Sequence, residues 1–150
     1  MGTLQVNLLR YAGRFAAIYV LIKVVLFAVL FIALQFFQTE IPVKHVAFVA
    51  PLVTAMLVGQ RLFKREGARL IGGKLHKLTG LCLLIIIAID APLGYLAFPD
   101  IEGLSDIMGL IIGLVLFFAF LAYWSIFFGY RIGFGTAEKE AAKRDARNAG

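Results

Sequence analysis

Two charged residues lie inside long apolar stretches of the sequence, and their types permit ion chemistry. Lys23 interrupts the apolar run 15–37, and Asp90 interrupts the run 78–98. A charge in apolar surroundings is costly unless it is paired or reaches water. At about 1.5 Å of rise per residue, Lys23 lies roughly 12 Å and Asp90 roughly 18 Å from the start of its run. A long Lys side chain can close that difference, so the sequence predicts a charge pair.

This pair has a functional and a structural interpretation. In the functional one, Asp90 binds a proton or cation and Lys23 is its counter-charge; Pro92 lacks an N–H group and leaves the Ala88 carbonyl free, as in transporter ion sites. In the structural one, the two form an ion pair, or Lys23 extends to the membrane edge while Asp90 bonds Thr54. The structural interpretation is favoured because a transporter usually has more polar residues facing its pathway, and the candidates here are Gln35, Thr54, Gln60 and Ser125.

The sequence lacks the residue patterns of an enzyme or a cofactor site. No hydrolase elbow or His-Glu-x-x-His motif is present, and the single Cys82 lies in an apolar run, where a thiol usually packs. His45 and His76 are expected in loops at opposite ends of the run 46–63, too far apart to share a haem. We expect no catalytic residue, metal or cofactor.

Three acidic residues, Asp100, Glu102 and Asp106, precede the last apolar run. Hard divalent cations bind several carboxylate oxygens, so a weak ion site is one interpretation. The better supported one is a helix start, because Ser105 is a plausible N-cap and acids stabilise a helix N-terminus without metal.

The composition indicates where these residues must be held. The 150 residues are 61% hydrophobic and only 16% charged, with a mean hydropathy of +0.90, which excludes a water-soluble domain. Four runs have about the length of a bilayer-spanning helix: 15–37, 46–63, 78–98 and 107–130. The first is too long for the apolar part of a signal peptide. We expect an all-α polytopic membrane protein, a four-transmembrane-helix bundle over 1–135 with a charged tail at 136–150.

The basic residues predict how the chain is oriented. Thirteen Lys and Arg lie before the first run, between the second and third, or after the fourth, whereas the other two loops contain only Lys44. Because Lys and Arg resist translocation, both termini and the middle loop should face the cytoplasm. This predicts a multi-pass protein of the bacterial inner (cytoplasmic) membrane with an N-in/C-in topology.

The middle loop combines basic and apolar side chains. Its charges suit contact with anionic lipid headgroups or a protein partner, while its apolar residues Leu62, Phe63, Leu70, Ile71 and Leu75 suit the headgroup layer. Gly67 and the pair Gly72–Gly73 should break it into short pieces. Membrane lipid, not nucleic acid, is the expected partner of its six basic residues: Arg61, Lys64, Arg65, Arg69, Lys74 and Lys77.

The two ends of the chain have simpler predictions. Arg10 and Arg14 share one helical face, and Leu8, Tyr11 and Phe15 share another, which indicates an interfacial helix leading into the first span. The tail after the flexible segment 133–135 is expected to form a solvated, partly frayed helix, since it lacks a stripe of large apolar residues.

Small and aromatic residues indicate how the spans pack. Gly109 and Gly113 form a Gly-x-x-x-Gly motif, and Ala55 and Gly59 repeat its spacing, so close helix packing is expected, either within the chain or in a homo-oligomer. The last run is rich in aromatic residues typical of a lipid-facing interfacial belt, namely Phe117, Phe118, Phe120, Tyr123, Trp124, Phe127, Phe128 and Tyr130.

Residues 49–67, and above all Gly59-Gln60-Arg61 with the basic residues that follow, resemble the signature stretch of a family of small, uncharacterised four-span proteins of the bacterial inner membrane. The resemblance implies four spans and transfers no catalytic residue. Some small multi-span bacterial proteins of this general kind neutralise pore-forming toxins as immunity proteins.

Two function classes follow. The first is a non-catalytic interaction protein with a membrane-protein partner, such as a toxin-immunity protein or accessory subunit. The second is a small oligomeric proton- or cation-coupled transporter or channel that uses Asp90. The small number of intramembrane polar residues favours the first.

Overall fold

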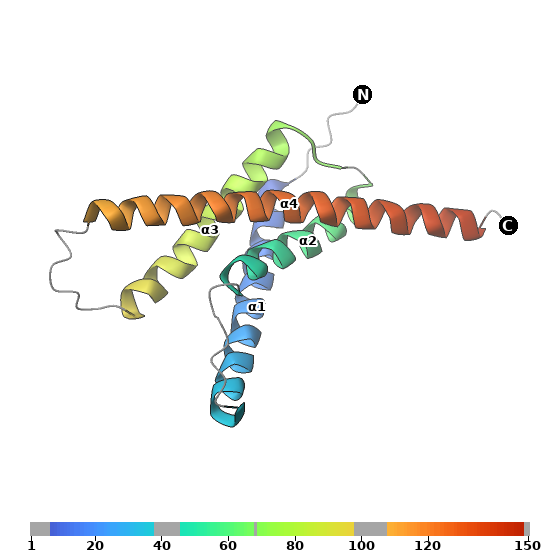
Figure 1. Ribbon diagram of the computed structural model, residues 1–150. Helices are drawn as coiled ribbons and strands as arrows, with labels where there is room; N and C mark the ends of the chain where they lie inside the picture. Colours follow the sequence, from blue (N-terminus) through green and yellow to red (C-terminus); the bar gives the residue numbers. More distant parts are fainter. Residues whose placement is uncertain (1–6, 38–45, 68, 98–107, 149–150) are drawn as a thin grey trace.

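The computed structural model describes residues 7–37, 46–67, 69–97 and 108–148, and all its regular elements are helices (Figure 1). They are α1 (Leu8–Phe37), α2 (Val46–Glu66), α3 (Gly73–Ala97) and α4 (Met108–Asn148). The all-α prediction is therefore confirmed. In the described ranges, three segments are long and apolar enough to cross a membrane: Leu8–Ala33, Gly73–Pro92 and Ile112–Asn148.

Local sequence determines several helix ends. The Arg10 backbone N–H donates to Asn7 Oδ1 at 3.3 Å, which caps the start of α1. Gly67 and Gly72 have φ angles of 64° and 59°, a left-handed conformation that glycine adopts without a steric penalty. The Gly67 N–H donates to the Phe63 carbonyl at 2.9 Å and closes the last turn of α2. The prediction that glycines break this segment is confirmed at both positions.

Helix α4 is longer than its apolar run, and the predicted flexible segment at 133–135 is wrong. The 41-residue helix runs without interruption through Gly133 and Gly135. At about 1.5 Å per residue it is about 60 Å long, roughly twice the hydrocarbon thickness of a bilayer. The glycines stay helical because α2 packs against this part of α4, which removes the conformational freedom that glycine has in a loop.

Each helix packs against two others. Within the described residues, α1 contacts α2 and α3, and α4 contacts α2 and α3, while the pairs α1–α4 and α2–α3 lie diagonally opposite. The contact between α2 and α4 is the most extensive. Figure 1 shows the helices crossing near the N-terminal part of α1, with the C-terminal ends of α1 and α3 and the N-terminal end of α4 pointing in different directions.

The α2–α4 contact depends on glycines of α4. A Cβ atom placed on Gly129 would lie 2.5 Å from the Leu52 carbonyl oxygen, and one on Gly133 would overlap the Met56 carbonyl oxygen. A Cβ on Gly59 of α2 would lie 3.1 Å from the Tyr130 carbonyl oxygen. The two backbones therefore approach closely over one turn, as small residues four apart permit.

This contact involves a second Gly-x-x-x-Gly motif of α4, and the predicted packing role of Gly109 and Gly113 stays a prediction. Ala55 is fully buried and, with Gly59, faces α4, but the facing glycines are Gly129 and Gly133. Gly109 and Gly113 have no neighbouring atom within 4 Å of the position a Cβ would take. The sequence contains two Gly-x-x-x-Gly motifs, and among the described residues the one beside α2 makes the close helix contact.

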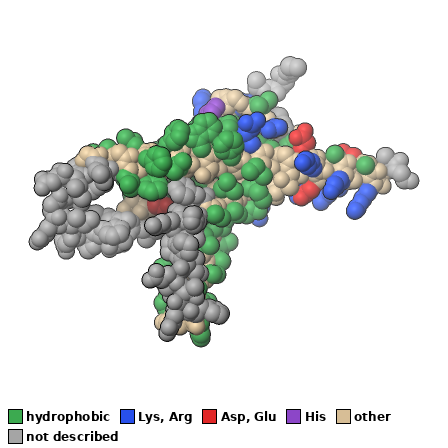
Figure 2. All heavy atoms as spheres, in the orientation of Figure 1, with side chains coloured by type: hydrophobic (Ala, Val, Ile, Leu, Met, Phe, Trp, Pro, Cys, Tyr) green, Lys and Arg blue, Asp and Glu red, His purple; other side chains and the backbone are tan. Residues whose placement is uncertain are grey.

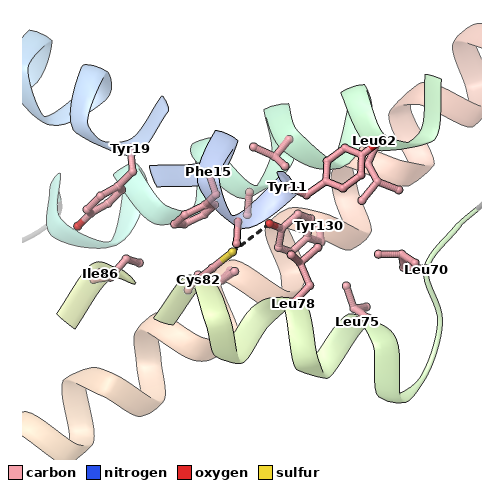
Figure 3. Close-up of a cluster of buried hydrophobic side chains, with 14 of the residues drawn as sticks. Tyr11, Phe15, Tyr19, Leu62, Leu70, Leu75, Leu78, Cys82, Ile86 and Tyr130 are labelled. Atoms are coloured by element: carbon pink, nitrogen blue, oxygen red, sulfur yellow. Dashed lines mark hydrogen bonds between the residues drawn. The ribbon is translucent and has the colours of Figure 1, made fainter. Parts of the chain in front are cut away.

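The buried core includes residues predicted at the membrane surface. Figure 3 shows Tyr11 and Phe15 of α1 in the core with Leu62, Leu70 and Leu75, and all five are at most 6% exposed. The predicted interfacial face of the N-terminal stretch is therefore a core face. The middle-loop leucines likewise pack against protein and not against headgroups, because α2 ends and α3 begins beside the core.

Large apolar surfaces lie outside this core. Because Leu52 is opposite Gly129 and Lys64 contacts Glu140, α2 runs parallel to the C-terminal half of α4. The N-terminal half of α4 and the C-terminal half of α1 expose their apolar side chains, which Figure 2 shows on both helices. Examples are Phe27, Phe31, Leu116 and Phe120, each more than half exposed.

The α2–α4 contact predicts opposite effects for two equivalent substitutions. Gly133→Ala should lower the free energy of unfolding in detergent by about 1–3 kcal/mol, because the added methyl meets rigid backbone. Gly113→Ala is the matched control. It should leave stability unchanged or raise it by up to about 1 kcal/mol, since alanine favours a helix and nothing lies nearby. Equal losses in both variants would show that the two glycines are equivalent and contradict this packing.

Candidate functional site

Asp90 accepts hydrogen bonds from two side chains of α1. Its Oδ2 atom is 3.1 Å from the Lys23 ammonium nitrogen and 2.8 Å from the Tyr19 hydroxyl oxygen. The structure thus brings together the two charged residues that the sequence singles out. Lys23 and Asp90 form an ion pair, with Tyr19 as a third member.

Helix periodicity explains the placement of Tyr19 and Lys23. They are four residues apart, so they lie one above the other on the face of α1 that packs on α3. Tyr19 is buried at 1% exposure, and its ring stacks on Phe15 with centroids 5.9 Å apart. The Lys23 ammonium lies 5.4 Å from the centre of the Tyr19 ring, within range of a cation–π interaction.

Tyr19 is not among the residues predicted for this site, although its spacing of four residues from Lys23 could have identified it. Tyr19 lies four residues before Lys23, so its hydroxyl shares the helical face from which Lys23 contacts Asp90.

The carboxylate of Asp90 is only partly satisfied. Its Oδ1 atom is buried and has no hydrogen-bond partner in the described part of the chain. The Lys23 and Asp90 side chains are nevertheless 36% and 35% exposed, so the pair reaches the molecular surface. Asp90 therefore combines an enclosed oxygen that has no partner in the described part of the chain with other side-chain atoms that reach the surface.

Thr54, the alternative partner of Asp90, is engaged within its own helix. It is fully buried, and its hydroxyl donates to the Ala50 carbonyl at 2.7 Å. Because a hydroxyl has one proton, Thr54 cannot donate to Asp90 at the same time.

A cavity of about 340 Å³ lies beside Asp90, and all four helices contribute to its wall. Tyr19 comes from α1, Pro51 from α2, Asp90 from α3 and Phe118 from α4. Figure 3 shows Tyr19 and Ile86, another wall residue, at the same end of the buried core. Apart from Asp90 and the Tyr19 hydroxyl, the wall consists of apolar side chains: Pro51, Leu83, Ile86, Ile87, Ala91, Val115, Phe118, Ala119 and Ala122.

Cys82 packs in the core, where the sequence places it. It is fully buried, and its Sγ lies 3.2 Å from the hydroxyl oxygen of Tyr130 (Figure 3). Tyr130, predicted in a lipid-facing belt, is also fully buried. Its hydroxyl finds a partner in the thiol, which explains how a large polar aromatic residue is accommodated.

The prediction of a loop position for His76 is wrong. His76 lies in the first turn of α3, with Nδ1 2.5 Å from the Tyr123 hydroxyl and its ring stacked on Phe127 at 5.2 Å. Helix α3 begins five residues before the apolar run, and this additional helical turn places His76 against α4.

His45 lies outside the described residues, as do Asp100, Glu102, Ser105 and Asp106. Among the residues described, no group of three His, Cys, Asp or Glu side chains could hold a metal ion.

The six basic residues of the predicted middle loop lie at the end of α2, at Arg69 and in the first turns of α3, and all are exposed, as contact with lipid headgroups or a partner requires. The Lys64 ammonium lies 2.6 Å from a Glu140 carboxylate oxygen and connects α2 to the charged end of α4. Figure 2 shows Lys and Arg side chains along that end of α4.

The Lys23–Asp90 pair predicts coupled losses of stability. Lys23→Met and Asp90→Asn should each destabilise the protein, and a double-mutant cycle should give a coupling of about 0.5–3 kcal/mol. Tyr19→Phe should cost about 1.5–3 kcal/mol, because a hydrogen bond to a charged group is lost. The matched control is the exposed pair Lys64→Met with Glu140→Gln, for which a clearly smaller coupling is expected because solvent screens the two charges. Strictly additive losses at Lys23 and Asp90 would exclude a stabilising pair.

Comparisons with family models, curated proteins and solved structures find no match for this chain.

Proposed function

We propose that the chain is a four-span protein of the bacterial cytoplasmic membrane, with both termini inside, that binds a cation at Asp90 as part of a transport cycle. Three helices with membrane-spanning length and composition support the location, and α2 joins them through the apolar sequence 46–63. The distribution of Lys and Arg supports the orientation.

A single observation carries the functional part of this proposal. An ion pair that bridges α1 and α3 lies at a cavity lined by all four helices, and both charged side chains remain about one-third exposed. A purely structural pair gains most when it is fully surrounded by partners. Here the Asp90 Oδ1 atom has no donor among the described residues, which supports a site whose carboxylate is not saturated by its protein partners.

The geometry indicates how such a site would work. In the unloaded state the Lys23 ammonium neutralises Asp90, which lowers the cost of a carboxylate in hydrocarbon. When a proton or cation binds Asp90, the attraction that holds Lys23 is weakened, and its flexible side chain can move away. Because Lys23 and Asp90 belong to different helices, this exchange would loosen the α1–α3 contact.

A second candidate is a non-catalytic interaction protein, such as a toxin-immunity protein or accessory subunit. The exposed apolar halves of α1 and α4 favour it, since α2 covers only the C-terminal half of α4. The resemblance of residues 49–67 to small four-span proteins is compatible with either class. For the transport proposal the structure adds Tyr19 and the cavity to the polar residues known from the sequence.

The topology is tested with reporter fusions after Gln38, Gly67, Gly103 and Gly150. Fusions after Gly67 and Gly150 should report a cytoplasmic position, and fusions after Gln38 and Gly103 a periplasmic one, because Lys and Arg resist translocation. A periplasmic signal at Gly67 or Gly150 would contradict the orientation.

Transport is tested with purified protein in liposomes. A proton gradient should drive a flux that Asp90→Asn abolishes, while Glu140→Gln, which removes a different ion pair, should retain it. Absence of flux from folded protein would contradict transport. The interaction class would then be preferred if the chain bound a partner identified in native membranes and either protected cells from a toxin or changed the activity of that partner.

A further inference from the structure

We propose that the ligand of the Asp90 cavity is a small lipophilic amine, bound as its ammonium ion, that replaces the Lys23 ammonium. This inference rests on the cation site proposed above and names its ligand class. The ammonium would contact Asp90 and Tyr19, and a compact apolar body would fill the cavity.

Lys23 itself shows what chemistry the site accepts. Its side chain is a primary alkylammonium, 3.1 Å from the carboxylate oxygen of Asp90 and 5.4 Å from the centre of the Tyr19 ring. A carboxylate, a phenol hydroxyl and an aromatic face are the groups that recognise an organic ammonium. The site is therefore already occupied by an internal ligand of the proposed class.

The cavity indicates where the remainder of an external ligand would lie. Lys23 reaches Asp90 from α1 and does not line the cavity, so the space beside the carboxylate stays available. At about 340 Å³, it is at the small end of the range of roughly 300–1,000 Å³ found for ligand sites. Its aliphatic and aromatic wall suits a single ring or a short branched chain.

The same wall disfavours an inorganic cation. Alkali and alkaline-earth ions must replace their hydration shell with several oxygen ligands. The described site provides the carboxylate of Asp90 and the hydroxyl of Tyr19, and the other side chains that line the cavity are hydrocarbon. An organic ammonium is less strongly hydrated, and its apolar body gains by leaving water.

Competition with Lys23 distinguishes this site from an apolar cavity that any hydrocarbon could fill. If the ligand ammonium takes the place of the Lys23 ammonium, removing Lys23 should strengthen binding, and neutralising Asp90 should weaken it. A cavity that holds a lipid chain by apolar contact alone would respond to neither change.

The test uses the full chain in lipid nanodiscs and equilibrium dialysis with radiolabelled 2-phenylethylamine at neutral pH, with empty nanodiscs to subtract partitioning into lipid. The amine should bind at least about tenfold more tightly than 2-phenylethanol, its neutral counterpart. A tenfold difference in affinity corresponds to about 1.4 kcal/mol of binding free energy. Asp90→Asn should remove this preference, and Lys23→Met should raise the affinity for the amine several-fold. Glu140→Gln should leave it unchanged.

Ala119→Leu provides a second, uncharged test, because it fills the cavity wall without touching the ion pair. It should weaken amine binding at least about tenfold and leave the Lys23–Asp90 coupling intact. This variant keeps the inference testable if Asp90→Asn does not fold.

Three results would overturn the inference: equal affinity for amine and alcohol, amine binding that persists in folded Asp90→Asn, or unchanged binding in Ala119→Leu. The outcome is independent of the transport measurement. Amine binding without flux would support the ligand assignment and contradict the transport cycle. Proton flux without amine binding would support the transport cycle and contradict the ligand assignment.

Discussion

Backbone contact between α2 and α4 at Gly129 and Gly133 determines the arrangement of the other elements. Two helices that meet without side chains between them have few alternative registers, because a shift by one residue would bring a side chain against a carbonyl oxygen. That register places α2 beside the C-terminal half of α4 and extends the contact to Lys64 and Glu140. The core then forms where α1 and α3 close over this pair, around Tyr130, Phe15 and Cys82 (Figure 3).

The same register explains why the cavity lies where it does. Helix α4 continues past the N-terminal end of α2, and α1 and α3 diverge from it, so the four helices come together only along a short length (Figure 1). Beyond the core the separation grows, and the small side chains of Ala119 and Ala122 do not fill it. The ion pair spans the α1–α3 contact at this point. It holds the two helices together where apolar packing becomes incomplete.

The sequence predicted the helical class and the charge pair because both follow from one-dimensional rules. Apolar run length predicts helices, and the depths of Lys23 and Asp90 follow from rise per residue. The position of Tyr19 could have been predicted by the same reasoning. The sequence could not show which of Gly109–Gly113 and Gly129–Gly133 faces α2, because both pairs have the same spacing and, among the described residues, only the contact with α2 distinguishes them. His76 was misplaced for a related reason: α3 starts on polar residues that pack against α4, and hydropathy does not detect a helix of that kind.

The distribution of satisfied polar groups gives the strongest reason to place chemistry at Asp90. The Thr54 hydroxyl donates to its own helix, Cys82 contacts Tyr130, and His76 contacts Tyr123. In the described part of the chain, the buried side-chain oxygens without a hydrogen-bond partner are those of Thr79 and one oxygen of Asp90. Thr79 is neutral and fully buried, whereas Asp90 is charged, partly accessible and beside a cavity. Among the described residues, Asp90 therefore differs from Thr79 in combining charge, partial accessibility and an adjacent cavity, and this combination supports the proposal of a cation site there.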